Sequence, residues 1–263
     1  ELKSLTILDA GCGTGYLGRA LYHQYRKYHK WHQLQTEQCT DLQYSDLQKE
    51  MPMTLTAFDL SSEMLNVAKE QGSYQHFITG DIEALREGDR QSREQKARQK
   101  EPQKEELSHE DLYPKYDLIM SSLAIQWCHD FKGALLSLQS VAKFDNGVNA
   151  FVDILKNPNR IYVTTLVEGT LYELASAFKF IDDEEHILTF ETPHHIQESV
   201  TNLGGRVEFY QEVITFPDLK SLFKSLKGIG ATNLPNRRKG LLGKAGYRKL
   251  EAYFKTLGQY QLT

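Results

Sequence analysis

The chain has 263 residues, of which 40% are hydrophobic and 25% are charged, and its formal net charge is -4. A chain of this length buries a sizeable core, which excludes a need for disulfides or a structural metal. Three widely spaced cysteines without a CxxC pair (Cys12, Cys39 and Cys128) favour a reducing compartment, and no apolar run reaches the roughly 20 residues of a membrane helix. We therefore expect a cytoplasmic protein that makes no membrane contact. The first residue is Glu1 rather than Met, so we also expect that a leader segment precedes this chain.

The first half of the chain alternates apolar strands with amphipathic helices. The run 4–10 is an apolar strand that breaks into the glycine-rich turn 11–15, after which apolar residues repeat at helical spacing. Ser61 is a good N-cap for the helix that follows the second strand. Alternation of this kind predicts an α/β fold with a mostly parallel central sheet and helices on both faces. The further expected elements are strands at 54–60, 74–80, 116–122 and 161–166 and a helix at 131–143.

Three polar stretches interrupt this alternation, at about 28–52, 86–111 and 144–160. The second is almost devoid of apolar residues, and the third carries Asn-Gly and Asn-Pro-Asn turn signals. We expect all three to be loop insertions on the outside of a core domain that spans 1–166.

The part of the chain from 167 to 263 is expected to complete the sheet and to add helices that bind the substrate. Its pattern predicts helices at about 169–180 and 193–203, an alternating strand at 206–216, and a helix that Asp218 opens. Lys220, Lys224 and Lys227 share one face of that last helix, and Arg237, Arg238 and Lys239 follow in a basic loop.

Positive charge is concentrated near the end of the chain. Ten basic residues and one acid lie between 219 and 256, so this segment carries about +9 and the rest of the chain about -13. The segment therefore predicts an acidic partner, and the alternative is an ordinary solvated face.

The first turn has the chemistry of a site for a cation. It reads Asp9-Ala-Gly11-Cys-Gly13-Thr-Gly15, and its glycines let the backbone approach a ligand at the start of a helix. The spacing is GxGxG rather than the GxGxxG of dinucleotide binders, and Asp9 would repel a diphosphate. S-adenosylmethionine has no phosphate and carries a sulfonium and an ammonium, so it fits this arrangement.

Two further acids follow strands and complete the predicted cofactor site. Asp59 is placed to accept the two ribose hydroxyls, because ligands of open α/β sheets lie across the carboxyl ends of the strands. Asp81 is placed to accept from the adenine amino group, while Ile82 packs on the ring. Each acid alone is equally typical of a solvated strand end, but three at consecutive strand ends favour a common site.

These segments resemble the motifs of the class I S-adenosylmethionine-dependent methyltransferases. The matching segments are Leu8-Asp-Ala-Gly-Cys-Gly-Thr-Gly15, Phe58-Asp-Leu-Ser-Ser-Glu-Met-Leu65 and Gly80-Asp-Ile-Glu83. The resemblance implies the Rossmann-like fold of that class and a set of cofactor-binding residues, which are Asp9, Gly11, Cys12, Gly13, Gly15, Asp59, Leu60, Met64, Asp81, Ile82 and Ser121.

A narrower resemblance concerns the acceptor. Tyr116-Asp-Leu-Ile-Met-Ser-Ser-Leu-Ala-Ile-Gln-Trp-Cys128 and Leu226-Lys-Gly-Ile-Gly-Ala231 are similar to segments of the malonyl-[acyl-carrier protein] O-methyltransferase family of biotin synthesis. Ser122 departs from this pattern, where an Asn is expected, and the three insertions depart from it as well. The resemblance implies that the substrate is a malonyl thioester on acyl carrier protein or coenzyme A, and that the basic residues Lys220, Lys224, Lys227, Arg237, Arg238 and Lys239 bind the carrier.

The chemistry of this reaction places few demands on side chains. A malonyl carboxylate is already ionised at neutral pH, since the reference pKa of a carboxyl group is about 3.9, so no general base is needed. Alignment and exclusion of water then supply catalysis. Gln126 and Trp127 are the predicted catalytic residues, because they lie just past the fourth strand and can orient the carboxylate and wall the pocket. No His, Cys or Asp cluster has metal-ligand spacing, so no metal is expected.

Three alternatives remain at the level of the sequence, and one of them is a class I methyltransferase that acts on another small carboxylic acid. The basic tail would suit a methyltransferase that acts on RNA, but few aromatic residues are interleaved with the basic ones, so no nucleic-acid partner is expected. A non-catalytic binding module with a methyltransferase-like fold is the third alternative, and the complete set Asp9, Asp59 and Asp81 argues against it.

Overall fold

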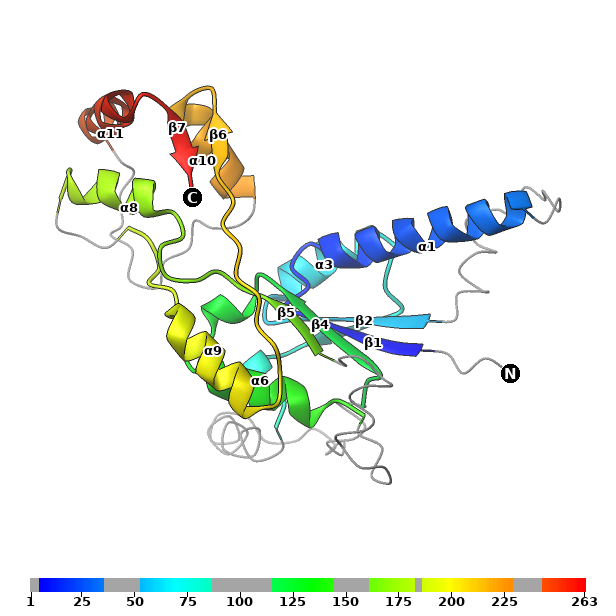
Figure 1. Cartoon of the computed structure of the whole chain (residues 1–263). Helices are drawn as coiled ribbons and strands as arrows, with labels where there is room; N and C mark the ends of the chain where they lie inside the picture. Colours follow the sequence, from blue (N-terminus) through cyan, green and yellow to red (C-terminus); the bar gives the residue numbers. More distant parts are fainter. Residues whose placement is uncertain (1–4, 36–52, 87–114, 144–160, 183–185, 229–242) are drawn as a thin grey trace, which may run out of the picture. The chain divides into compact units, whose positions relative to one another are not determined.

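The computed structural model describes residues 5–35, 53–86, 115–143, 161–182, 186–228 and 243–263 (Figure 1). The chain folds as two compact units, Glu1–Thr165 and Leu166–Thr263, each of which is described by itself. The second and third predicted insertions lie almost wholly outside the described residues, as does the first from residue 36 onward. No helix within the described part of the chain is long and apolar enough to cross a membrane.

The first unit is built on a five-stranded sheet with the strand order β3-β2-β1-β4-β5. All four pairings are parallel, which confirms the predicted α/β fold with a parallel sheet. The chain starts in the centre, moves outward to β3, and returns past β1 to β4, so the strand order reverses between β1 and β4. The strands are β1 (Leu5–Ala10), β2 (Met53–Asp59), β3 (His76–Thr79), β4 (Leu118–Ser122) and β5 (Ile161–Thr164).

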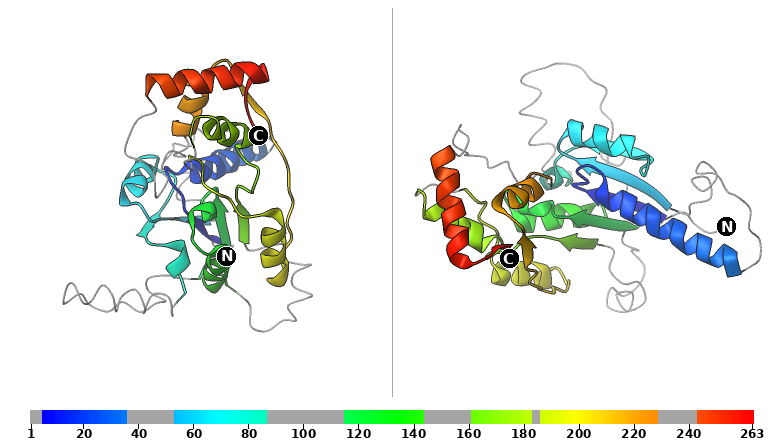
Figure 2. Two further views of the ribbon diagram at one scale, coloured as in Figure 1. Left: turned by 90° about the vertical axis from the view of Figure 1, so that its left-hand side faces the viewer. Right: turned by 90° about the horizontal axis from the view of Figure 1, so that it is seen from above.

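Helices cover both faces of this sheet, as predicted. α1 (Tyr16–Gln35) and α3 (Ser62–Glu70) lie on one face and α6 (Phe131–Ser140) on the other (Figure 1, Figure 2). Successive residues of a strand point to opposite faces, so the buried side chains sort into two layers. The layer under α1 and α3 contains Ile7, Leu55, Ala57, Tyr22, Leu65, Ala68 and Tyr74.

The second unit has its own hydrophobic core. Its elements are α8 (Tyr172–Lys179), α9 (Pro193–Asn202), β6 (Ile214–Phe216), α10 (Leu219–Gly228), α11 (Lys244–Leu257) and β7 (Tyr260–Leu262). Leucine and phenylalanine side chains of α8, α10 and α11 pack together with Leu262 of β7. Glu173 fixes the end of the chain, because its carboxylate accepts from the Thr263 N–H at 3.0 Å and from the Thr263 hydroxyl at 2.6 Å.

The structure corrects the predicted layout of this second unit. The strand expected at 206–216 is reduced to Ile214–Phe216, because its partner β7 offers only three residues. These two strands pair antiparallel with each other, so among the described residues they do not complete the five-stranded sheet. The predicted helix 169–180 begins only at Tyr172, since Leu171 has a left-handed φ of 61°.

Two helix ends of the first unit also differ from the prediction. α1 continues to Gln35, so the first eight residues of the expected insertion 28–52 belong to this helix. α6 ends at Ser140 rather than near Lys143, because Ala142 forms a bridge with Tyr116 and returns the chain to the sheet. In the second unit, no predicted element corresponds to α11.

Candidate active site

The carboxyl ends of the five parallel strands meet at one edge of the sheet, and the predicted site residues of the first unit follow these ends. Ligands of open α/β sheets bind outside this edge, at the point where the strand order reverses. Here that point lies between β1 and β4. The turn after β1 and the segment after β4 therefore flank the candidate site.

The glycine turn after β1 has the close backbone approach that its sequence predicts. Gly11 has a φ of 75°, and a Cβ atom on it would lie 2.2 Å from the Ala124 Cβ. The N–H groups of Gly11 and Cys12 both donate to the Phe58 carbonyl, at 2.7 and 3.0 Å, which holds the turn against β2. Gly13 has a φ of 53°, and a Cβ atom there would have nothing within 4 Å. The turn thus offers open space at Gly13 for a ligand.

Asp59 connects this turn to the end of β2. Its Oδ2 accepts from the Gly13 N–H at 2.8 Å, and its Oδ1 accepts from the Ser61 N–H at 2.9 Å. Two backbone donors fix the plane of the carboxylate. Each oxygen of a carboxylate can accept a second hydrogen bond. Asp59 is thus a pre-oriented double acceptor, which suits a pair of vicinal hydroxyls.

Asp9 lies deeper than Asp59 and is held by a tyrosine. The Tyr74 hydroxyl donates to Asp9 Oδ2 at 2.5 Å and accepts from the Gly18 N–H at 3.0 Å. Burial raises the pKa of Asp9 to about 6; the Tyr74 hydrogen bond acts in the opposite direction, and the Asp59 carboxylate adds to the rise. A bound cation would lower that pKa again, so a cationic ligand and the ionised form of Asp9 stabilise each other.

The third acid begins a short connecting helix. Asp81 caps the 3-10 helix η1 (Ile82–Ala84), because its Oδ1 accepts from the Glu83 N–H at 2.9 Å. Ile82 is buried, and its Cδ1 would lie 3.5 Å from a Cβ atom on Gly11. Ile82 therefore lies beside the glycine turn, where it can contact a flat apolar group.

The predicted catalytic residues lie on η2 (Ile125–Trp127), directly after β4. The Gln126 side-chain amide donates to the Leu123 carbonyl at 2.7 Å, and Leu123 has a left-handed φ of 52°. This contact uses one of the two amide hydrogens of Gln126. Trp127 is 44% exposed, so its indole is available to a ligand. Neither observation assigns a catalytic role, which stays a prediction.

The remaining predicted cofactor residues fall into two groups. Leu60 and Met64 are exposed at the end of β2 and on the first turn of α3, as an apolar contact with a ligand requires. Ser121 is buried, and its hydroxyl donates to the Ala10 carbonyl at 2.8 Å. The side chain of Ser121 therefore joins β4 to β1, and the role of Ser121 in cofactor binding stays a prediction.

Burial determines the chemistry of the two cysteines near the site, Cys12 and Cys128. Cys12 is buried, and burial raises the pKa of its thiol well above the usual range, with the Asp9 and Asp59 carboxylates adding to the rise. Burial likewise raises the pKa of Cys128 to about 12. Neither thiol ionises near neutral pH, so neither is a nucleophile.

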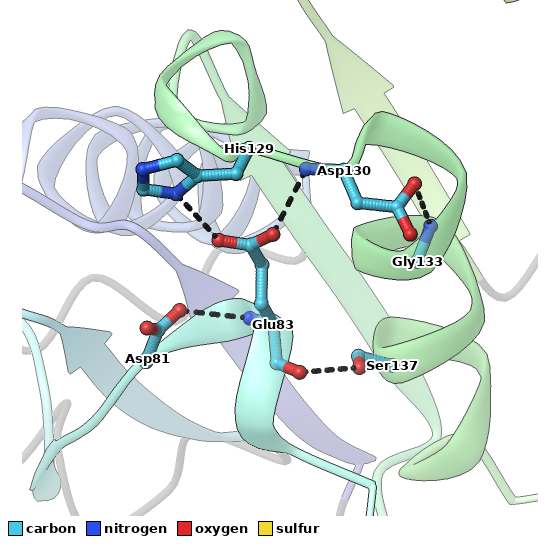
Figure 3. A network of polar contacts seen from close by, with 6 residues as sticks. All are labelled: Asp81, Glu83, His129, Asp130, Gly133 and Ser137. Atoms are coloured by element: carbon cyan, nitrogen blue, oxygen red, sulfur yellow. Dashed lines mark hydrogen bonds and ion pairs between the residues drawn. The ribbon is translucent and has the colours of Figure 1, made fainter. Parts of the chain in front are cut away.

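Two residues of the site escaped the sequence prediction. Tyr74 holds Asp9 and the first turn of α1, and Glu83 joins η1 to the segment after η2 (Figure 3). Their partners lie 65 and 47 positions away in the chain, so local pattern does not reveal them. The only local signal was the position of Glu83 directly beside the predicted adenine contacts.

The basic residues of the second unit are only partly described. Lys220 and Lys224 are exposed on α10, opposite the buried Leu219, Leu222 and Leu226. The side chain of Lys227 and the whole of Arg237, Arg238 and Lys239 lie outside the described residues. Within the part of the chain that the structure describes, no three His, Cys, Asp or Glu residues are grouped to hold a metal ion.

Comparison with known proteins identifies the family. A family model described as a methyltransferase domain matches residues 2–235. The malonyl-[acyl-carrier protein] O-methyltransferase of Hamiltonella defensa is 31% identical over 265 residues, which cover 100% of this chain and 78% of that protein. The enzyme of the same name from Salmonella typhimurium is 30% identical over 262 residues, covering 98% and 78%, and that from Serratia marcescens is 28% identical over 259 residues, covering 98% and 76%. The chain therefore belongs to the methyltransferase-domain family, and within it to the family of the malonyl-[acyl-carrier protein] O-methyltransferases.

Proposed function

We propose that this protein transfers a methyl group from S-adenosylmethionine to the free carboxylate of malonyl-[acyl-carrier protein], the reaction that its resemblance assigns to biotin synthesis. The single observation that carries the proposal is the match of the whole chain, at 31% identity, to an enzyme of that name. The geometry at the carboxyl edge of the sheet supports the same chemistry.

The residues at this edge fit the proposed cofactor. Asp9, Asp59 and Asp81 supply negative charge, which attracts a sulfonium and an ammonium and repels a phosphate. The open space at Gly13 admits a ligand beside the double acceptor Asp59, which we propose binds the ribose hydroxyls. Asp81 and Ile82 would hold the adenine, and the exposed Leu60 and Met64 would cover the apolar parts of the cofactor. When bound, S-adenosylmethionine supplies an electrophilic methyl group.

The chain's own residues then have to bind and orient an acceptor that needs no deprotonation. The second amide hydrogen of Gln126 can donate to a malonyl carboxylate, while the first holds the amide against Leu123. The exposed indole of Trp127 can exclude water from the same place. Orientation of this kind is what a direct displacement between two bound reactants requires.

The carrier protein is the proposed partner of the basic segment. Lys220 and Lys224 lie one helical turn apart on the exposed side of α10, which makes them neighbours. Exposed charges mainly raise the rate of association with a partner of opposite charge. We propose that this face, with the basic residues that follow it, attracts an acidic carrier protein.

A transfer assay with matched acceptors tests the proposed function. The protein is incubated with S-adenosylmethionine that carries a labelled methyl group, and with either malonyl-carrier protein or acetyl-carrier protein. Label should enter only the malonyl form, because the acetyl form has no free carboxylate. Equal labelling of both forms would contradict carboxyl transfer, and labelling of an added RNA in place of either carrier would favour the RNA alternative.

A further inference from the structure

Glu83 joins three segments at one side of the candidate site (Figure 3). Its Oε1 accepts from the Asp130 N–H at 2.9 Å, and its Oε2 lies 3.4 Å from His129 Nδ1. Its own N–H donates to Asp81 Oδ1, and its carbonyl accepts from the Ser137 hydroxyl at 3.2 Å. One residue of η1 thus contacts the residues before α6 and α6 itself.

The contacts of Glu83 connect the cofactor side of the proposed site with its acceptor side. On one side, Asp81 and Ile82 belong to the proposed cofactor site and are direct neighbours of Glu83. On the other side, His129 and Asp130 end the short segment that follows Gln126 and Trp127. In Figure 3 the Glu83 carboxylate points from η1 toward His129 and Asp130, so it lies between η1 and the segment that follows η2.

The Glu83 carboxylate is built into the fold and is not a solvated surface charge. Its side chain is 14% exposed, whereas that of His129 is 96% exposed, so the backbone bond to Asp130 is the better shielded of its two contacts. The Asp130 side chain is used elsewhere, because its Oδ1 accepts from the Gly133 N–H to cap α6.

We propose that Glu83 is a positioning residue that holds the segment 128–130, and with it Gln126 and Trp127, in register with the cofactor side of the site. The inference rests on the proposed function for its kinetic consequence, though the contact itself does not depend on it. Glu83 acts on the acceptor side of the reaction through the Asp130 backbone, whereas η1 keeps its cap from Asp81 without the Glu83 side chain.

Kinetics of Glu83 variants distinguish this role from general stabilisation. Glu83→Ala should lower kcat/KM for malonyl-carrier protein at least tenfold, while the dissociation constant for S-adenosylmethionine changes less than threefold. Glu83→Gln should stay within threefold of the parent in both, because its amide oxygen can still accept from the Asp130 N–H. Glu70→Ala, which removes an exposed acid on α3, is the matched control and should change neither quantity.

Either of two kinetic results would overturn the inference. One is an equal loss of cofactor affinity and acceptor turnover in Glu83→Ala, which would make Glu83 a residue of general stability. The other is an equal defect in Glu83→Gln and Glu83→Ala, which would show that charge and not the bond to Asp130 matters. If Glu83→Ala does not fold, Glu83→Asp is measured in its place, because this variant keeps the charge but shortens the side chain that reaches the Asp130 N–H. The expected result is the same: kcat/KM for malonyl-carrier protein falls, while the dissociation constant for S-adenosylmethionine changes little.

Hydrogen exchange provides a readout that needs no catalysis. Trp127 and Cys128 donate backbone hydrogen bonds to Ala124 and Ile125 within η2. In Glu83→Ala without ligands, the amides of Trp127 and Cys128 should exchange at least tenfold faster than in the parent, and in Glu70→Ala they should not. Unchanged exchange at these two amides would overturn the inference. If the parent does not methylate malonyl-carrier protein, the proposed function fails, but the exchange result still decides the role of Glu83.

Discussion

At the scale of single residues, Asp59 carries the most specific expectation about the cofactor. The Gly13 and Ser61 N–H groups fix its carboxylate, so its remaining acceptor positions are oriented before a ligand arrives. Asp59→Ala should weaken S-adenosylmethionine binding about tenfold to over a hundredfold, since a hydrogen bond to a charged group contributes roughly 1.5 to 3 kcal/mol. Titration calorimetry measures this directly, with Glu70→Ala as the control. Unchanged affinity would remove Asp59 from the site.

Asp9 predicts a dependence of stability on pH. Its pKa is raised from 3.8 to about 6 in the folded protein, so between these values the folded state holds a proton that the unfolded state has lost. The contribution of Asp9 to the free energy of unfolding is therefore greatest below about pH 4 and falls as pH rises to about 6. A shift of this size corresponds to about 3 kcal/mol.

The variant Asp9→Asn isolates this contribution, because an amide in place of Asp9 has no charge to lose. Urea unfolding of parent and variant from pH 4 to pH 7 gives the difference between their free energies of unfolding. Relative to Asp9→Asn, the parent should lose about 2 kcal/mol over that range, because the unfolded-state group is already more than half ionised at pH 4. If the difference between the two free energies of unfolding does not change with pH, burial does not raise the pKa of Asp9.

At the scale of elements, the glycine turn offers a matched pair of substitutions. Gly11→Ala adds a Cβ atom 2.2 Å from Ala124, whereas Gly13→Ala adds one in open space, and both positions have a positive φ. Gly11→Ala should therefore cost about 2 to 5 kcal/mol of stability, from strain and overpacking together, and Gly13→Ala only about 1 to 2 kcal/mol.

Cofactor affinity should rank these two variants differently. The Cβ atom of Gly13→Ala would occupy the space that the ligand needs, so this variant should bind S-adenosylmethionine at least tenfold more weakly while it stays folded. Thermal unfolding and calorimetry on the same samples give both quantities. A Gly13→Ala variant with normal affinity would place the cofactor elsewhere.

The basic face of α10 predicts an effect that only the carrier protein reveals. Reversal of Lys220 and Lys224 to Glu should raise the Michaelis constant for malonyl-carrier protein about tenfold at low salt, because exposed charges steer the encounter and salt screens them. Turnover of a short malonyl thioester that lacks the carrier protein should change less than twofold. Reversal of Lys179, which is exposed on α8 of the same unit, is the control. Equal losses on both substrates would mean that the α10 lysines serve the pocket or the fold.

At the scale of the whole molecule, the sequence predicted the first unit better than the second. Apolar strands with Asp9, Asp59 and Asp81 at or just past their ends placed β1, β2 and β3 and their common edge. The second unit has short strands and few turn signals, so β7 and α11 escaped prediction. In such a unit, packing between segments that are distant in the chain decides which of the alternating segments forms a strand.

The contacts that complete the site were beyond the reach of local pattern for the same reason. Two such contacts are the hydrogen bond of Tyr74 to Asp9 and that of Asp130 to Glu83. Both depend on how separate elements pack, so neither residue spacing nor residue type predicts them. Ser121 shows the reverse case, in which a polar residue at a strand end is used within the sheet.

The most direct test of the whole account is tandem mass spectrometry of malonyl-carrier protein after incubation with this protein and S-adenosylmethionine. The account predicts that the carrier gains one methyl group, that fragmentation places this group on the malonyl moiety, and that Asp59→Ala slows its appearance. A carrier of unchanged mass, or a methyl group on the protein part of the carrier, would contradict it.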